Sequence, residues 1–112
     1  MTKGPEQRLA HYGTLAPGRI NHHELDGLKG EWRTGIVRGF LVKMGWGADL
    51  GYPAINLDPD GEDVEVFIFE SPDLPAHWPR LDAFEGEQYV RVETEAETEQ
   101  GPVSVSIYAL NE

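Results

Sequence analysis

A glutamate near the C-terminal third of the chain has the surroundings of a proton acceptor. Glu85 follows an apolar Leu-x-x-Phe pair, Leu81 and Phe84, and precedes a glycine. This pattern predicts a helix end beside the core, where a carboxylate is partly desolvated and becomes a better base near neutral pH. The same residues also permit a surface glutamate at a helix terminus. Asp82, three residues earlier, is expected to cap the helix or face solvent.

A second candidate segment lies near the N-terminus, in His11-Tyr12-Gly13-Thr14-Leu15-Ala16-Pro17-Gly18, followed by Asn21-His22. A strand that ends in Tyr-Gly and then turns leaves several backbone N–H groups pointing in one direction. Such a loop can bind a carboxylate or a developing oxyanion without a charged side chain. A plain turn is the alternative. The segment is not a P-loop, because no Gly-Lys-Ser/Thr follows, and its spacing does not fit a dinucleotide-binding loop.

Other chemistries find little support in the residues. The chain has no cysteine, which excludes disulfides, thiolate nucleophiles and cysteine-based zinc sites. The four histidines (His11, His22, His23 and His77) do not have metal-ligand spacing, and no Gly-x-Ser-x-Gly is present. We therefore expect neither a metal site nor a cofactor.

The composition sets the broad class. The 112 residues suit one domain, residues 1–112, and the net charge is −11 with a pI of about 4.6. This acidity argues against nucleic acid and anionic lipid as partners. No apolar run reaches the ~18–20 residues of a membrane span, and no apolar stretch follows the N-terminal basic residue. We expect a cytoplasmic protein.

Frequent turn signals and short alternating segments predict a sheet-rich or barrel-like domain. Strands are expected at residues 9–14, 33–43 and 64–69, and as a hairpin formed by residues 89–97 and 103–108. A brief helix is expected at residues 21–28, and one or two short helical turns at 71–84, started or broken at Pro75 and Pro79. Residues 44–53 are expected to form a loop carrying two large aromatic residues.

The first hairpin strand also carries a row of glutamates, at positions 93, 95, 97 and 99. A row of like charges requires solvent, so we interpret it as a solvated face that also discourages edge-to-edge pairing. A docking stripe for a basic partner is the alternative.

Taken together, the two candidate segments resemble a known family. The pattern Tyr12-Gly13-Thr14-Leu15-x-x-Gly18-x-x-Asn21-His22, followed by Leu81-Asp82-x-x-Glu85-Gly86-x-x-Tyr89-x-Arg91, resembles the gamma-glutamylcyclotransferase-like (AIG2-like) family. It looks most like the gamma-glutamylamine cyclotransferase branch, and Gly51-Tyr52-Pro53-Ala54 between the two motifs also fits. The resemblance covers residues 9–110.

The resemblance implies an α+β fold, a small mixed β-barrel with a few short helices and a cavity at one end. The implied reaction converts a γ-glutamyl amide or γ-glutamyl amino acid to 5-oxoproline and a free amine, without metal or cofactor. Glu85 would be the catalytic base that takes the proton of the substrate's α-amine. Tyr12, Gly13, Thr14 and Leu15 would bind the substrate, and Tyr89 and Tyr108 would line the cavity. Arg91 would offset a substrate carboxylate or form an ion pair with a nearby glutamate.

Two features depart from the family pattern. Arg8-Leu9-Ala10-His11 is more polar than the hydrophobic strand expected before the loop, and Glu87-Gln88 replaces a longer insert before Tyr89. Two other functions remain open from the sequence: a non-catalytic member that binds a small amino-acid-like ligand, and an acidic interaction protein that uses residues 93–99 and 58–63. The leaving amine and the oligomeric state are left open.

Overall fold

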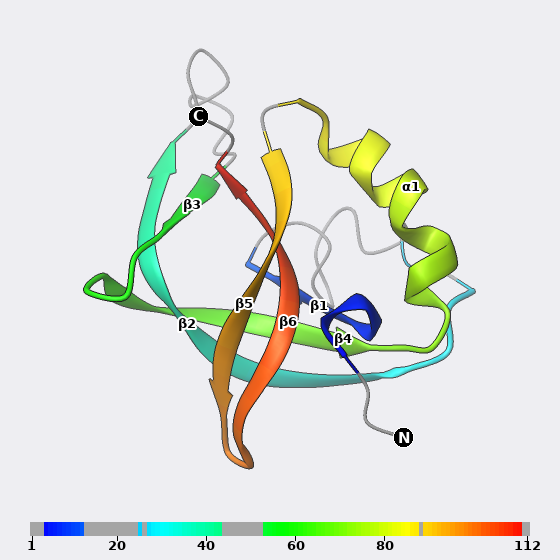
Figure 1. Ribbon diagram of the computed structural model, residues 1–112, viewed down its shortest axis with the longest axis horizontal. Helices are drawn as coiled ribbons and strands as arrows, with labels where there is room; N and C mark the ends of the chain where they lie inside the picture. Colours follow the sequence, from blue (N-terminus) through cyan, green and yellow to red (C-terminus); the bar gives the residue numbers. More distant parts are fainter. Residues whose placement is uncertain (1–3, 13–24, 26, 44–52, 88, 111–112) are drawn as a thin grey trace.

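The computed structural model describes residues 4–12, 25, 27–43, 53–87 and 89–110 (Figure 1). Within these ranges the chain forms six strands, one α-helix and one 3₁₀ turn. In chain order they are η1 (Pro5–Gln7), β1 (Arg8–His11), β2 (Glu31–Lys43), β3 (Pro53–Leu57), β4 (Glu62–Glu70), α1 (Leu74–Glu85), β5 (Tyr89–Thr98) and β6 (Gly101–Leu110).

Five of the strands close into a mixed barrel. β1 pairs with β4, β4 with β2, and β2 with β3, all antiparallel. The parallel pairings of β6 with β3 and with β1 then complete the circle. β5 lies outside the circle, antiparallel to β6, and pairs with β2 only at Ile36 and Glu97 among the described residues. The α+β barrel implied by the resemblance is therefore confirmed.

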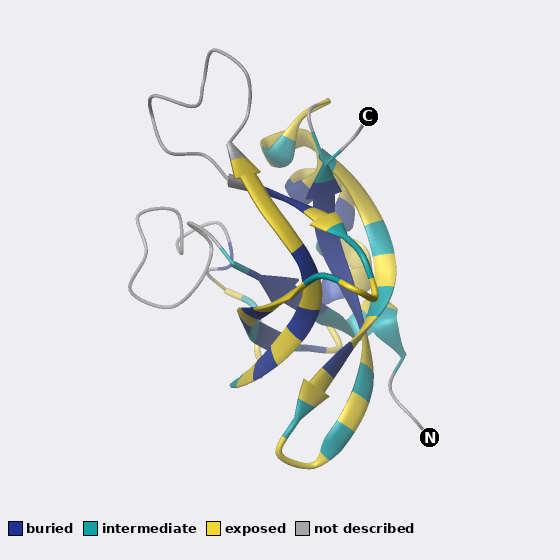
Figure 2. Cartoon of the chain, turned by 90° about the vertical axis from the view of Figure 1, so that its left-hand side faces the viewer, coloured by how far each residue is buried: buried dark blue, intermediate teal, exposed yellow. Residues whose placement is uncertain are grey.

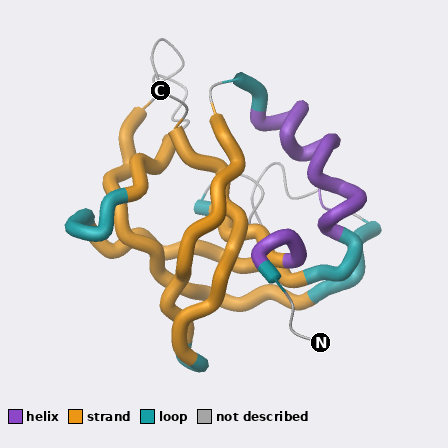
Figure 3. The backbone as a smooth tube through the Cα atoms, viewed as in Figure 1, coloured by secondary structure: helices purple, strands orange, loops and turns teal. Residues whose placement is uncertain are grey.

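The described residues form two apolar cores, one on each side of the barrel wall. Alternate strand residues such as Val66, Ile55 and Ile107 fill the barrel interior. Leu9, Phe69 and Tyr108 point outward and pack with Leu74, Trp78 and Leu81 of α1. The tube in Figure 3 shows α1 lying outside the body of strands. An apolar layer thus holds α1 against the outer face of the barrel.

β6 shows the consequence of this second core. Its burial alternates near the hairpin turn and then becomes continuous from Val105 to Ala109. One face of that stretch lies in the barrel and the other faces the outer core, so a polar residue such as Ser106 is also buried. Figure 2 shows the contrast between the alternating hairpin tip and the buried end of the sheet.

Most of the predicted strands are confirmed, with longer bounds. The hairpin and the strands predicted at residues 33–43 and 64–69 correspond to β5–β6, β2 and β4. β1 ends at His11, three residues before the predicted end. β3 was not predicted, because its five residues carry too little alternation. The helix predicted at residues 21–28 lies largely outside the described residues.

The helical segment predicted at residues 71–84 is confirmed, with Pro75 at its start, but the expected break at Pro79 is wrong. α1 is one helix of 12 residues that continues through Pro79. Pro75 occupies the first turn, where its missing N–H removes no bond. Pro79 is exposed, so the carbonyl left without a helical partner can be hydrated, while the buried side chains of Leu74, Trp78 and Leu81 hold the opposite face. Packing therefore outweighs the ~3 kcal/mol that an interior proline costs.

Candidate functional site

Glu85 is the last residue of α1, as the sequence predicted. The helix is ended by Gly86, whose φ of 81° suits a residue without a Cβ, and whose N–H donates to the carbonyl of Asp82 at 3.1 Å. The Glu85 side chain is only 9% exposed. The apolar Leu81, one turn earlier, is fully buried and anchors this end of the helix against the barrel.

His11, the last residue of β1, contacts the Glu85 carboxylate. Nε2 of His11 lies 3.0 Å from Oε1 of Glu85, and the His11 side chain is 8% exposed. An ionised carboxylate only accepts hydrogen bonds, so with Glu85 ionised Nε2 of the imidazole is the donor of this contact. The two groups come from positions 74 residues apart, so the barrel and its outer helix bring them together.

Tyr12 closes a gap in the barrel wall. Its hydroxyl donates to the carbonyl of Tyr108 at 2.6 Å and accepts from the N–H of Ile55 at 3.0 Å. At this point β6 changes its neighbour from β1 to β3, so the hydroxyl bridges β3 and β6. Burial, with smaller contributions from Tyr89 and Glu85, raises the pKa of Tyr12 above its ordinary value. The phenol therefore remains neutral at physiological pH.

Tyr108 connects β6 to α1. Its hydroxyl donates to Oδ1 of Asp82 at 2.7 Å, and the same oxygen lies 3.3 Å from Nε of Arg91. Burial, followed by the hydrogen bond to Asp82, raises the pKa of Tyr108 above its ordinary value. The guanidinium of Arg91 also lies over the Trp78 ring, 4.5 Å from its centroid. The Asp82 side chain is 44% exposed, so the predicted contact with solvent is confirmed in part, and it also accepts from Tyr108. Among the described residues, the ion pair of Arg91 is with Asp82, where a nearby glutamate was one predicted partner.

The structure brings most of the sequence-predicted site residues together. The negative charge of Glu85 contributes to the raised pKa of both Tyr12 and Tyr108. Tyr89, half-buried at the start of β5, packs on the outer core beside Tyr108. Gly13, Thr14 and Leu15 lie outside the described residues. Their predicted role, and those of the tyrosines, stay predictions.

His11 is the residue that the sequence-based assignment of the site omitted. The signal was its polarity at the end of a strand otherwise expected to be buried. The alternation of β1 places His11 on the same face as Leu9, which is the face covered by α1. A polar residue on a covered face requires a partner, and Glu85 provides it.

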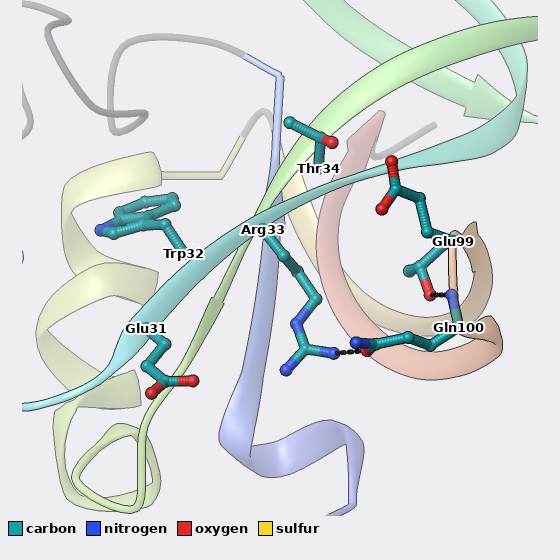
Figure 4. Close-up of a pocket in the computed structure, with 7 residues that line it drawn as sticks. Glu31, Trp32, Arg33, Thr34, Glu99 and Gln100 are labelled. Atoms are coloured by element: carbon teal, nitrogen blue, oxygen red, sulfur yellow. Dashed lines mark hydrogen bonds between the residues drawn. The ribbon is translucent and has the colours of Figure 1, made fainter.

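A pocket of about 370 Å³ lies elsewhere, between β2 and the β5–β6 turn (Figure 4). Arg33 and Gln100 point toward one another in it, with Nη1 of Arg33 donating to Oε1 of Gln100 at 2.8 Å. Glu70 also pairs with Arg33, at 3.5 Å, and with Arg8, at 2.9 Å. These contacts connect β1, β2, β4 and the hairpin, so they stabilise the barrel away from Glu85.

A second pocket, of about 400 Å³, lies beside Tyr12. Apart from Tyr12, its lining residues are Phe40, Leu41 and residues 62–65.

The described residues contain no cluster of three or more histidine, aspartate or glutamate side chains suited to a metal ion. In the same part of the chain, no helix is both long and apolar enough to cross a membrane.

Comparison with known sequences identifies the family. The family model described as "Gamma-glutamyl cyclotransferase, AIG2-like" matches residues 9–112. The chain belongs to this family. Cyclotransferase-type chemistry is therefore its general functional class, whereas the substrate is a separate question. No curated protein sequence gives a significant match.

Solved structures share the fold. The AIG2-like protein A2LD1 (GGACT) from Mus musculus has a TM-score of 0.72 at 23% identity, over 92% of this chain and 76% of that chain. PH0828 from Pyrococcus horikoshii, described as uncharacterized, has a TM-score of 0.65 at 22% identity, over 94% and 78%. YkqA from Bacillus subtilis has a TM-score of 0.72 at 24% identity, over 94% of this chain. The present chain covers only 36% of the length of the YkqA chain. At these identities the likeness concerns the fold.

Proposed function

We propose that the protein is a γ-glutamyl cyclotransferase that converts a γ-glutamyl amide or γ-glutamyl amino acid to 5-oxoproline and a free amine. The observation that carries the proposal is the Glu85 carboxylate, 9% exposed at the end of α1 and contacted by the His11 imidazole, inside the region matched by the family. A carboxylate held in this way is suited to move a proton within a site that excludes most water.

The proposed reaction begins with a proton transfer. The substrate's α-ammonium group gives one proton to the carboxylate of Glu85, and the freed nitrogen lone pair attacks the γ-carbonyl carbon of the same molecule. The new C–N bond closes a five-membered ring, and the carbonyl oxygen carries the charge of the tetrahedral intermediate. The amide C–N bond then breaks as the leaving nitrogen receives the proton from Glu85. The ring nitrogen, which still carries two of the ammonium protons, loses one to solvent and keeps the other as the lactam N–H, which leaves 5-oxoproline and the free amine.

Substrate binding is the second part of the proposal. Backbone N–H groups of Tyr12, Gly13, Thr14 and Leu15 would bind the substrate and stabilise the oxyanion. Tyr89 and Tyr108 would line the cavity, with the Tyr108 hydroxyl held by its hydrogen bond to Asp82. Holding the substrate in a bent conformer, with its amine near the γ-carbonyl, accounts for much of the rate, since the attack is intramolecular. The reaction changes no oxidation state and uses no cofactor, and its partner is a small γ-glutamyl molecule.

The test is release of 5-oxoproline from γ-glutamyl amino acids, γ-glutamyl-ε-lysine and γ-glutamyl amines, by wild type and Glu85→Gln. We expect wild type to release 5-oxoproline from at least one class and Glu85→Gln to release it at least about 10²-fold more slowly. Calorimetric binding of the same compounds to both proteins is measured in parallel. Binding without turnover by folded wild type would contradict the enzyme and favour a ligand-binding protein.

A further inference from the structure

The carboxylate of Glu85 sits in a place that is electrostatically unfavourable for it. The last turn of a helix carries the negative end of the helix dipole, and the last turn of α1 contains no basic residue. Burial adds to the cost, because the side chain is 9% exposed. A carboxylate in this position needs a hydrogen-bond donor from another element.

The hydroxyls of Tyr12 and Tyr108 do not supply that donor. Each hydroxyl has one proton, and Tyr12 gives its proton to the Tyr108 carbonyl while Tyr108 gives its proton to Asp82. Arg91 is engaged with Asp82 and with the Trp78 ring. His11 is placed differently, since its Nε2 faces Oε1 of Glu85 at 3.0 Å from the end of the adjacent strand.

We infer that His11 is a positioning residue for Glu85 in the proposed reaction. By donating from Nε2 to Oε1, the imidazole fixes the plane of the carboxylate and leaves Oε2 for the substrate's amine. The ring is itself held, because it lies nearly parallel to the Tyr12 ring, with centroids 5.6 Å apart and an angle of 15° between planes. β1 thus sets the orientation of the Glu85 carboxylate through His11, and α1 sets how far that carboxylate is buried. The inference rests on the proposed function.

Two substitutions separate orientation from packing. His11→Gln retains an amide N–H near the position of Nε2, whereas His11→Leu retains apolar bulk and removes the donor. We expect His11→Leu to lower kcat about 10–100-fold with KM within about 2-fold, because a misplaced reacting group costs rate more than binding. His11→Gln should recover most of the lost kcat. His77→Gln is the matched control, since His77 lies eight residues, about 12 Å along α1, from Glu85.

A spectroscopic measurement applies even if His11→Leu does not fold. Long-range ¹H–¹⁵N correlation of the imidazoles reports which ring nitrogen carries a proton. In wild type we expect His11 to be protonated at Nε2, and we expect its ring shifts to change in Glu85→Gln but not in Glu95→Gln. A His11 ring protonated at Nδ1 alone, or unchanged in Glu85→Gln, would overturn the inference.

The failures of the two proposals are distinguishable. If wild type releases 5-oxoproline and His11→Leu does so with unchanged kcat, the positioning role is wrong and the proposed function stands. If His11→Gln and His11→Leu lose kcat equally, the imidazole acts through packing, and the inference is again overturned. If folded wild type releases none from the full panel, the proposed function is wrong and the inference with it.

Discussion

Glutamates occupy two contrasting regions of this molecule. Glu85 lies in the layer between the barrel and α1, where its carboxylate is 9% exposed and meets an imidazole. Glu93, Glu95 and Glu97 lie on the outer face of β5 and are exposed. The residue type is the same, and the difference in exposure and partners comes from the position of each glutamate in the fold. Desolvation and a fixed donor suit a carboxylate to chemistry, whereas solvation suits it to keeping a strand soluble.

Neutralising one glutamate from each region gives the largest expected difference. Glu85→Gln should lower kcat/KM about 10²–10⁴-fold, the usual range for losing a general base. Glu95→Gln should stay within about 2-fold of wild type, because its side chain is exposed on the outer strand. Initial rates of 5-oxoproline release measure both. Equal losses in the two variants would remove the functional distinction between the regions.

The same contrast extends to stability. Trp78→Ala should lower the free energy of unfolding by about 3–5 kcal/mol, because the ring fills the outer core. Its Nε1–H also donates to the Glu6 carbonyl at 2.9 Å. Val90→Ala should cost less than about 1 kcal/mol, because Val90 is 40% exposed on β5. Urea titrations at one pH compare them, and a Trp78→Ala cost below 1 kcal/mol would contradict the packing role of α1.

The two buried phenols sharpen the comparison within the site. Tyr12→Phe should cost about 1–3 kcal/mol, because it leaves the buried N–H of Ile55 and the Tyr108 carbonyl without their hydrogen-bond partner. Tyr108→Phe should cost about 1 kcal/mol, because Asp82 is 44% exposed and can be hydrated. The reverse order in urea titrations would show that the Tyr12 bridge does not hold β3 to β6.

The last prediction concerns the dependence of stability on pH. The pKa values of Tyr12 and Tyr108 are raised in the folded state, so folding retains protons that unfolded phenols lose above pH ~10. Their contribution to stability is complete below pH ~10 and declines as pH rises, by about 1 kcal/mol per phenol at pH 11. Urea midpoints between pH 8 and 11 should fall more for wild type than for Tyr12→Phe. An equal fall would argue against this linkage.

The sequence predicted the strands and the helix end around the site better than the contacts between them. Alternation identified β5 and β6, runs of apolar residues identified most of β2 and β4, and the Leu-x-x-Phe-Glu-Gly pattern located the end of α1. Barrel closure came from the family resemblance, because local patterns do not specify which distant strands pair. The continuity of α1 through Pro79 depends on packing against the outer face of the barrel, which local helix propensity does not report.

Contacts between distant residues were the least predictable. The His11–Glu85 contact spans 74 residues and the Tyr12–Tyr108 bridge spans 96. Arg91 was predicted to contact a substrate carboxylate or a nearby glutamate. The structure instead places Asp82 of α1 beside it. Such partners follow from the relative placement of elements and not from spacing along the chain.

The most direct test of the central claim follows the nitrogen that closes the ring. A γ-glutamyl compound carrying ¹⁵N in its α-amine is incubated with wild type and with Glu85→Gln, and its products are observed by NMR. The account predicts ¹⁵N in the lactam of 5-oxoproline with wild type and unreacted substrate with Glu85→Gln. Free glutamate that keeps ¹⁵N as an amine, or equal lactam formation by both proteins, would contradict it.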